Sequence, residues 1–343
     1  MGKMFITFGE IMLRLKSPGY ERLLQSHMLE STFGGGEANV AVSLSQFGLP
    51  ARFATVLPEN DIGRACEAEL MSFGVDTSNI VFAPGRIGIY YLEAGANQRP
   101  SKVIYDRDHS CLADAAEDSF NWEEVFSDGG WFHITGITPA ISESAARLSI
   151  KAVQAAKKAG ITVSCDLNYR KNLWEYGKKA PEVMGELVKY VDIIVANEED
   201  MQKALDIQYQ ADIDSGTLDS QAYEKMAQEL VKKYPNVKKV AITLRESKSA
   251  SHNDWSACLY SGGEFFVSKK YEIRDIVDRV GGGDSFSAGL IYGLNQYSSD
   301  AAALEFAVAA SCLKHSIIGD FNRVSVKEVE LLAGGNASGR ISR

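Results

Sequence analysis

Short apolar runs rich in β-branched residues alternate with stretches of helical periodicity along most of this chain. In the second half, the strand-like segments 130–137 and 161–168 enclose the strongly periodic segment 142–160. The first half repeats the pattern, with a helix predicted over residues 37–47 and a glycine at position 48 to end it. Such alternation is typical of a mostly parallel sheet covered by helices. We therefore predict an α/β fold with three αβα layers.

Two segments break this rhythm. Residues 86–108 are predicted to form two strands around a turn that contains Gly, Asn and Pro, with no helix between them, which is typical of a hairpin. Residues 11–25 supply a further extended piece. We therefore expect a small β lid, built from about residues 11–33 and 86–110 and inserted into one domain of residues 1–335. The small polar residues 336–343 are expected to form a flexible tail.

The charge balance narrows the classes of partner. The chain has 36 Lys and Arg against 45 Asp and Glu, so its formal net charge is −9. An acidic surface disfavours nucleic acids and anionic membranes as main partners. No apolar run reaches the roughly 18 residues of a membrane span, and the N-terminal segment has no secretory cleavage site. The five cysteines form no C-x-x-C pair. We expect a cytoplasmic protein that binds small molecules.

Three consecutive glycines, Gly281, Gly282 and Gly283, precede Asp284 and a predicted helix. Amide N–H groups exposed at a helix N-terminus form a candidate anion site. A carboxylate beside them can accept the proton of an attacking hydroxyl during phosphoryl transfer. On spacing alone, a glycine-rich turn with Asp284 as its N-cap remains the alternative.

Polar residues follow three of the predicted strands, at 165–170, 196–200 and 242–247. The carboxyl ends of parallel strands meet at one edge of a sheet, where ligands bind. This arrangement favours a ligand site. Other nucleotide motifs are missing from the sequence: G-x-x-x-x-G-K-[ST] is absent, and the glycines at 34–36 lack the third glycine of G-x-G-x-x-G. A P-loop enzyme and a nicotinamide dehydrogenase are therefore disfavoured, as is a protein kinase, whose motif set is missing too.

Taken together, these pieces resemble the ribokinase-like (PfkB) carbohydrate kinases over nearly the whole chain, and most closely their 2-keto-3-deoxygluconate kinase branch. The segments that carry the resemblance are FGGGEANVAVSLSQFG at 33–48, YDR at 105–107, DLNYRKNLW at 166–174, NEED at 197–200 and DRVGGGDSFSAGLIYGL at 278–294. The resemblance implies a ribokinase-like αβα fold with a β lid. It also implies ATP and Mg²⁺ as cofactors, with a monovalent cation as a further candidate.

The resemblance also implies roles for single residues. Asp284 matches the catalytic base, and Gly281, Gly282 and Gly283 match the anion hole. Gly34, Gly35 and Asn39 match the loop that contacts the sugar. The implied ATP contacts are Asn168, Arg170, Asn197, Thr243, Arg245, Ser247, Gly281 and Gly283. Asp200 stands where the family's N-x-x-E motif has Glu, so it is the implied indirect magnesium residue. The expected nucleotide loop, residues 245–257, lacks the usual glycines.

Positive charge points to a sugar acid as substrate. Arg107 and Arg170 could each hold a carboxylate by a two-point fork, and Arg170 is also a candidate phosphate contact. Tyr90, Tyr91 and Tyr105 are expected to pack on the carbon chain. Asp320 is a candidate to bind a sugar hydroxyl.

The expected reaction is ATP-dependent phosphorylation of the 6-hydroxyl of 2-keto-3-deoxygluconate under the lid, with the gluco and galacto epimers both open. Two alternatives also stay open: a kinase for a neutral sugar such as fructose or ribose, and a non-catalytic sugar-binding protein on the same fold. Pairing of lids between subunits would give a homo-oligomer.

Overall fold

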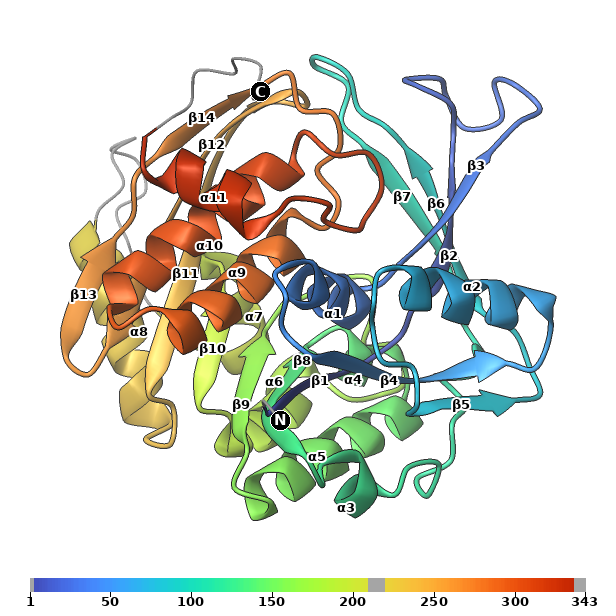
Figure 1. The fold of residues 1–343 in the computed structure, drawn as a ribbon, viewed down its shortest axis with the longest axis horizontal. Helices are drawn as coiled ribbons and strands as arrows, with labels where there is room; N and C mark the ends of the chain where they lie inside the picture. The colour runs from blue at the N-terminus through green and yellow to red at the C-terminus, as the bar shows by residue number, and fades with distance from the viewer. Residues whose placement is uncertain (1–2, 209–219, 336–343) are drawn as a thin grey trace.

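A computed structural model of the chain describes residues 3–208 and 220–335. The predicted tail, 336–343, lies outside the described residues. A mostly parallel sheet carries helices on both faces, as the sequence pattern predicts (Figure 1). The main sheet runs in the order β13-β12-β11-β10-β9-β8-β1-β4-β5, and β14 pairs with β12. Neighbours from β5 to β11 are parallel, whereas the pairs of β12 with β11, β13 and β14 are antiparallel.

The strands of the main sheet are β1 (Met4–Phe8), β4 (Ala51–Pro58), β5 (Ile80–Ala83), β8 (Gly129–Thr135), β9 (Thr162–Asp166), β10 (Ile193–Ala196), β11 (Lys239–Ser249), β12 (His252–Ser261), β13 (Glu264–Val267) and β14 (Tyr271–Arg274). Apart from β5 at the edge, which is only partly buried, the strands β1, β4, β8, β9 and β10 are buried over most of their length. Helices cover both of their faces, which accounts for the continuous apolar runs in the sequence.

The helices are α1 (Gly36–Gln46), α2 (Asp61–Ser72), α3 (Trp122–Val125), α4 (Thr138–Ile141), α5 (Glu143–Lys158), α6 (Ala180–Leu187), α7 (Glu198–Leu205), α8 (Ser220–Lys233), α9 (Gly282–Gln296), α10 (Asp300–Lys314) and α11 (Val326–Ala333). Apolar side chains of α5 to α8 share one core cluster with the sheet, and those of α1, α9 and α10 share another. The predicted stop of α1 holds, because Gly48 adopts a left-handed φ of 82°.

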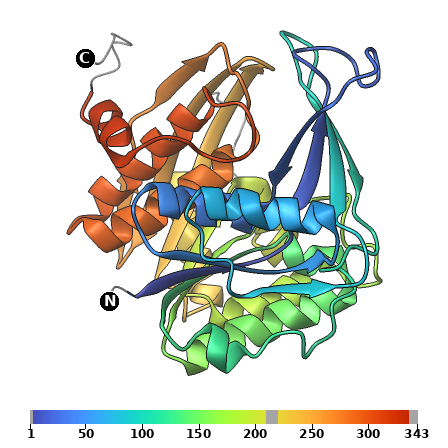
Figure 2. The same cartoon turned by 45° about the vertical axis from the view of Figure 1, so that its right-hand side comes forward.

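A second, smaller sheet stands out from the main body (Figures 1 and 2). Its order is β3-β2-β6-β7, with β2 at Met12–Lys16, β3 at Glu30–Gly34, β6 at Gly88–Glu93 and β7 at Lys102–Asp106. The antiparallel pair of β6 and β7 is the hairpin predicted between residues 86 and 108. The extended piece expected after Ile11 supplies β2.

The segment 245–257, expected as a nucleotide loop, is instead a β-hairpin. Strand β11 continues past Leu244 to Ser249, and β12 returns from His252 in antiparallel register. The outer half of β11 is polar and mostly exposed, so its sequence lacks the apolar character used to identify the buried strands. Tertiary pairing with β12 holds it extended.

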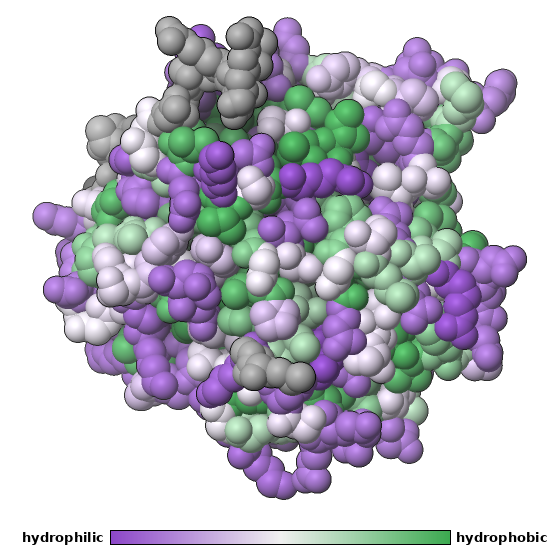
Figure 3. All heavy atoms as spheres, viewed as in Figure 1, coloured by the Kyte–Doolittle hydropathy of each residue, from purple (hydrophilic) through white to green (hydrophobic). Residues whose placement is uncertain are grey.

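Hydrophilic residues cover most of the face in Figure 3, and apolar residues appear between them in small groups. Among the described helices, none combines the length and the apolar character that a membrane crossing requires.

Candidate active site

A cavity of about 730 Å³ opens at the carboxyl ends of the parallel strands, between the small sheet and the start of α9. Most residues proposed from the sequence line it: Gly34, Gly35, Asn39, Tyr90, Tyr105, Asn168, Arg170, Asn197, Asp200, Thr243, Arg245, Gly281, Gly282, Gly283, Asp284 and Asp320. Segments far apart in the sequence thus meet at the sheet edge where an α/β fold is expected to bind ligands.

The glycine turn before α9 presents free backbone amides to this cavity. Gly281 is the N-cap in the left-handed conformation, with φ at 81°. A Cβ at Gly281 would lie 2.2 Å from the carbonyl oxygen of Asp320, so glycine is required there. The Gly282 amide donates to the Arg279 carbonyl at 3.3 Å, whereas the Gly283 and Asp284 amides have no hydrogen-bond acceptor within the described part of the chain. Two N–H groups at a helix N-terminus are therefore available to an anion.

Asp284 lies buried beside these amides. Asn39, on α1, donates a hydrogen bond from Nδ2 to Oδ2 of Asp284 at 2.7 Å. Burial raises the pKa of Asp284 to about 6, while the Asn39 hydrogen bond opposes that increase. The carboxyl is consequently ionised above about pH 6 and is poised to accept a proton near neutral pH.

Asp320 connects the small sheet to the glycine turn. Its Oδ1 accepts hydrogen bonds from Arg14 on β2 and from Tyr90 on β6, both at 2.6 Å. A Cβ at Gly34 would come within 2.0 Å of Oδ2 of Asp320, so only glycine fits at that point of β3. Oδ2 accepts no hydrogen bond from the described residues and stays available to a ligand hydroxyl.

Carboxylates gather where β9 and β10 end. Asp166, at the end of β9, is buried, and the pKa of its carboxyl is raised well above the usual range by burial and by the charges of Asp200 and Asp284. Asp200 forms a capping box with Asn197 and also accepts from the Tyr169 amide at 2.9 Å. Oxygen donors crowded together in this way are the chemistry that Mg²⁺ prefers. Both Asp200 oxygens already accept amide hydrogen bonds, which suits an indirect, water-mediated role.

Three of the residues proposed for the site do not line the cavity in the described structure: Tyr91, Arg107 and Ser247. Tyr91 alternates with Tyr90 along β6 and so points to the opposite face of the small sheet. Ser247 lies on the outer part of β11, beyond the cavity wall.

Arg107 was expected to bind a substrate carboxylate, but the structure pairs it with Glu10. The Arg107 Nε donates to Glu10 Oε2 at 2.7 Å, and the Arg107 residue is only 4% exposed. The central carbon of its guanidinium lies over the Tyr105 ring, 5.5 Å from the ring centroid. Glu10 is distant in sequence and meets Arg107 only in the fold, so the sequence alone does not show this pairing. The role of Arg107 as a carboxylate ligand stays a prediction.

Sequence reasoning did not assign a role to Asp166 or Arg279, two ionisable residues that line the cavity. Asp166 is the last residue of β9, so the rule that ligands bind at the carboxyl ends of strands could have identified it. Arg279 directly precedes Val280 and the glycines, and its position in the same motif was the available signal.

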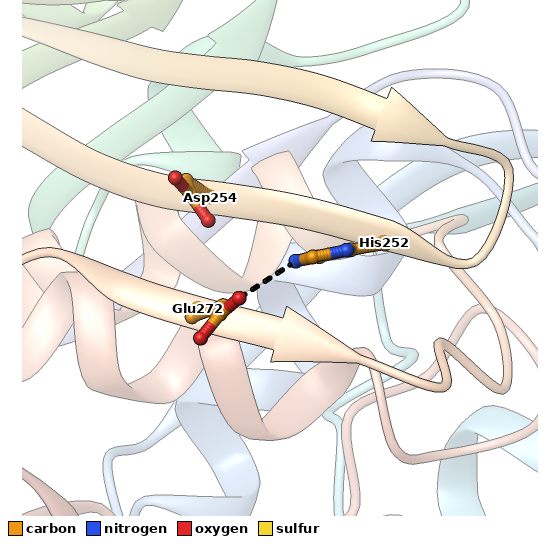
Figure 4. Close-up of side chains that lie close together, drawn as sticks. All are labelled: His252, Asp254 and Glu272. Carbon is orange, nitrogen blue, oxygen red and sulfur yellow. Dashed lines mark hydrogen bonds and ion pairs between the residues drawn. The ribbon is translucent and has the colours of Figure 1, made fainter.

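A further group of ionisable residues lies outside the cavity. In the described residues, His252, Asp254 and Glu272 bring potential ligand atoms within 4.8 Å of one another on β12 and β14 (Figure 4). Lys248 and Lys270 pair with Asp254, and Arg274 pairs with Glu272. Because three cations already balance this group, we assign no metal to it.

The family model described as pfkB family carbohydrate kinase matches residues 3–320. The 2-dehydro-3-deoxygalactonokinase of Haloferax volcanii is 33% identical over 333 residues, which cover 97% of this chain and 97% of that protein.

Solved structures resemble the chain over nearly its full length. The 2-dehydro-3-deoxygluconokinase of Thermotoga maritima superposes with a TM-score of 0.92 at 47% identity, covering 98% of this chain and 99% of that one. A PfkB family carbohydrate kinase from Listeria grayi gives a TM-score of 0.87 at 36% identity, with coverage of 97% and 100%.

Proposed function

Because this chain belongs to the pfkB family of carbohydrate kinases, we propose that it transfers the γ-phosphoryl group of ATP to the 6-hydroxyl of 2-keto-3-deoxygluconate, also called 2-dehydro-3-deoxygluconate. The observation that carries the proposal is the buried Asp284 carboxyl beside free amides in the cavity. The names of the Haloferax volcanii and Thermotoga maritima relatives support a 2-keto-3-deoxy sugar acid as the acceptor.

In the proposed reaction, Asp284 accepts the proton of the 6-hydroxyl. The hydroxyl oxygen then forms a bond to the γ-phosphorus as the bond to the β-phosphate oxygen breaks and ADP leaves. Asn39 holds the Asp284 carboxylate in place through its 2.7 Å hydrogen bond. The Gly283 and Asp284 amides stabilise the charge on the transferring group, because they point to it without reorganisation.

The nucleotide and magnesium occupy the β9, β10 and β11 side of the cavity in this proposal. Asn168, Asn197, Thr243 and Arg245 line that side and are the proposed ATP contacts. Asp166 and Asp200 are the residues that would hold Mg²⁺, Asp200 through water. When bound, the ion would neutralise phosphate charge.

The sugar acid occupies the side formed by the small sheet. Gly34, Gly35, Tyr90 and Tyr105 line that side. Oδ2 of Asp320 is the proposed acceptor for a sugar hydroxyl. Arg170 is exposed at the cavity, and its Nη1 donates to the adjacent Tyr169 carbonyl at 3.0 Å, so the rest of its guanidinium can meet the substrate carboxylate or a phosphate. Segments 11–33 and 86–110 act as the lid that excludes water from the reaction.

A substrate screen tests this proposal. ADP formation is measured with ATP and, in parallel, the gluco and galacto 2-keto-3-deoxy acids, fructose and ribose, and ³¹P NMR identifies the phosphorylated carbon. We expect the highest kcat/KM for a sugar acid and a product phosphorylated at C6. Preference for fructose or ribose would support the neutral-sugar alternative. Tight sugar binding without ATP consumption would support the non-catalytic one.

We further propose that the lid pairs with the lid of a second copy. Of the twelve exposed large apolar residues in the described structure, six belong to the lid segments, and Leu24 and Met28 are the most exposed of all, at 70% and 69%. A two-fold dimer would cover these exposed apolar side chains. Light scattering should give the mass of a dimer for the wild type and of a monomer for Leu24→Asp. A monomeric wild type would rule the lid interface out.

A monovalent cation is the remaining cofactor prediction. Next to the glycine turn, the side chain of the buried Lys314 lies near Gly281, and its ammonium donates to the Ile317 carbonyl at 3.1 Å. Arg14 pairs there with Asp278 and Asp320. Since the chain itself supplies positive charge there, we propose that the enzyme does not require a monovalent cation. Its turnover should then be equal in K⁺ and in choline buffers. A strict K⁺ requirement would contradict this.

A further inference from the structure

The arginines of this acidic chain are mostly matched by carboxylates. Within residues 3–208 and 220–335, the arginines that form no ion pair are Arg170, Arg245, Arg279 and Arg323. The first three line the cavity. Guanidinium groups left unpaired around one cavity, in a chain of net charge −9, indicate that the cavity receives an anion.

Of these three side chains, that of Arg279 makes the most hydrogen bonds to the described chain. Its Nη2 donates to the Ala250 carbonyl at 2.5 Å and to the Ser249 carbonyl at 3.4 Å, at the turn of the β11–β12 hairpin. The Ala250 amide in turn donates to the Asn97 carbonyl at 2.8 Å, which fixes that turn against the lid. The Nε and Nη1 groups of Arg279 have no acceptor among the described residues. The guanidinium is thus oriented by the backbone and keeps donors for a ligand.

The charge of Arg279 is not neutralised by the chain. Burial and the neighbouring Arg245 lower its pKa, and their effect outweighs that of Asp278, which raises it. The adjacent carboxylate, Asp278, is occupied by Arg14 and by the amides of Val280 and Gly319. Two cations held close together are stabilised when an anion binds between or beside them.

We propose that Arg279 is a phosphate-binding residue, which contacts the ATP phosphates next to the glycine turn and acts together with Arg245. This inference rests on the proposed kinase function. The main-chain carbonyl of Arg279 accepts the Gly282 amide, so Arg279 belongs to the same turn as the free amides of Gly283 and Asp284, and all three residues line the cavity. We therefore expect an anion bound to those amides to lie within reach of the Arg279 side chain.

The chemistry of the acceptor favours phosphate over the substrate carboxylate at this place. In a 2-keto-3-deoxy sugar acid the carboxylate is C1 and the reacting hydroxyl is on C6. When the 6-hydroxyl meets Asp284, the carboxylate is at the far end of the carbon chain, away from the glycine turn. The segment 245–257 lacks the glycines whose amides would donate to a nucleotide phosphate. The free Nε and Nη1 groups of Arg279 can supply charge-assisted hydrogen bonds to phosphate in their place.

Calorimetric binding of ATP, ADP, AMP and adenosine to wild type and Arg279→Gln tests the proposal without any turnover. We expect the variant to bind ATP about 10- to 100-fold more weakly, as for the loss of hydrogen bonds to a charged group. The loss should shrink from ATP to AMP, and adenosine should bind equally to both proteins. Arg279→Lys keeps the positive charge but loses the additional N–H donors of the guanidinium, so its ATP affinity should lie between those of wild type and Arg279→Gln. Arg274→Gln, on exposed β14, is the matched control and should bind like wild type.

The outcomes separate the possible causes. Equal losses for adenosine and ATP would assign Arg279 to the structure of the hairpin turn and overturn the proposal. Unchanged ATP affinity in Arg279→Gln would overturn it as well, with the kinase function intact. A wild type that binds no ATP would instead contradict the proposed function. If Arg279→Gln fails to fold, the phosphate-dependent loss is read from Arg279→Lys.

Discussion

The hydrogen bond from Asn39 to Asp284 should set the pH at which the enzyme loses activity in acid. Asp284 acts as a base only when ionised, and its pKa in the folded protein is raised to about 6. Activity should therefore be full above that pH and should fall as the pH decreases through about 6. Asn39→Ala removes a donor that lies 2.7 Å from the carboxylate and favours its ionised form.

The size of the effect follows from that bond. A hydrogen bond to a charged group contributes about 1.5–3 kcal/mol, and one pKa unit corresponds to about 1.4 kcal/mol. The acidic limb should therefore move up by about 1 to 2 pH units in Asn39→Ala. For a shift of one unit, the ionised fraction of Asp284 at pH 6.5 falls from about three quarters to roughly one quarter.

The assay is the pH profile of the rate at limiting sugar acid and limiting ATP, where the free enzyme determines the limb. Titration of the substrates themselves is common to both proteins and cancels in the difference. Asn39 is also a proposed sugar contact, so the position of the limb is the readout, not the height of the profile. Ser43→Ala disturbs the same helix by removing a bond to the Asn39 carbonyl and should leave the limb in place. An active Asn39→Ala with the wild-type limb would refute this reasoning.

Two further substitutions test the small sheet and its contacts. Gly34→Ala places a Cβ within 2.0 Å of Oδ2 of Asp320 and so disturbs the proposed acceptor for a sugar hydroxyl. In steady-state assays the KM for the sugar acid should rise while the KM for ATP stays near the wild-type value. Equal changes in both KM values would argue against a sugar subsite at this position. Arg107→Ala leaves the Glu10 carboxylate buried without its partner, so urea unfolding should show a loss of about 3–5 kcal/mol, with all substrates affected alike. The exposed Arg86 provides the control, because Arg86→Ala should cost less than about 1 kcal/mol. Normal stability in Arg107→Ala with a defect confined to sugar acids would support its predicted role as a carboxylate ligand.

The sequence predicted those parts of the fold that depend on local pattern. Periodicity and the glycine at position 48 located α1, and the interruption of the strand–helix rhythm located β6 and β7. Asp284 and its glycines were identifiable because a helix start after a glycine run has a physical consequence of its own, an exposed set of amides.

What the sequence missed depends on tertiary pairing. The outer half of β11 is polar, and only its register with β12 shows that it is a strand. The sequence does not show that the fold brings Glu10 to Arg107, nor that Arg279 donates to backbone carbonyls and pairs with no carboxylate among the described residues. Unpaired charge is a property of the folded state, and a single sequence does not contain it.

Single-turnover phosphorylation of 2-keto-3-deoxygluconate by Asp284→Asn tests the central claim most directly. The substitution preserves the size of the side chain but removes the proton acceptor. At pH 7.5 the rate should fall by about 10²- to 10⁴-fold, while ATP binding and the unfolding transition stay close to those of the wild type. A folded Asp284→Asn that still phosphorylates the sugar acid at nearly the wild-type rate would contradict the account.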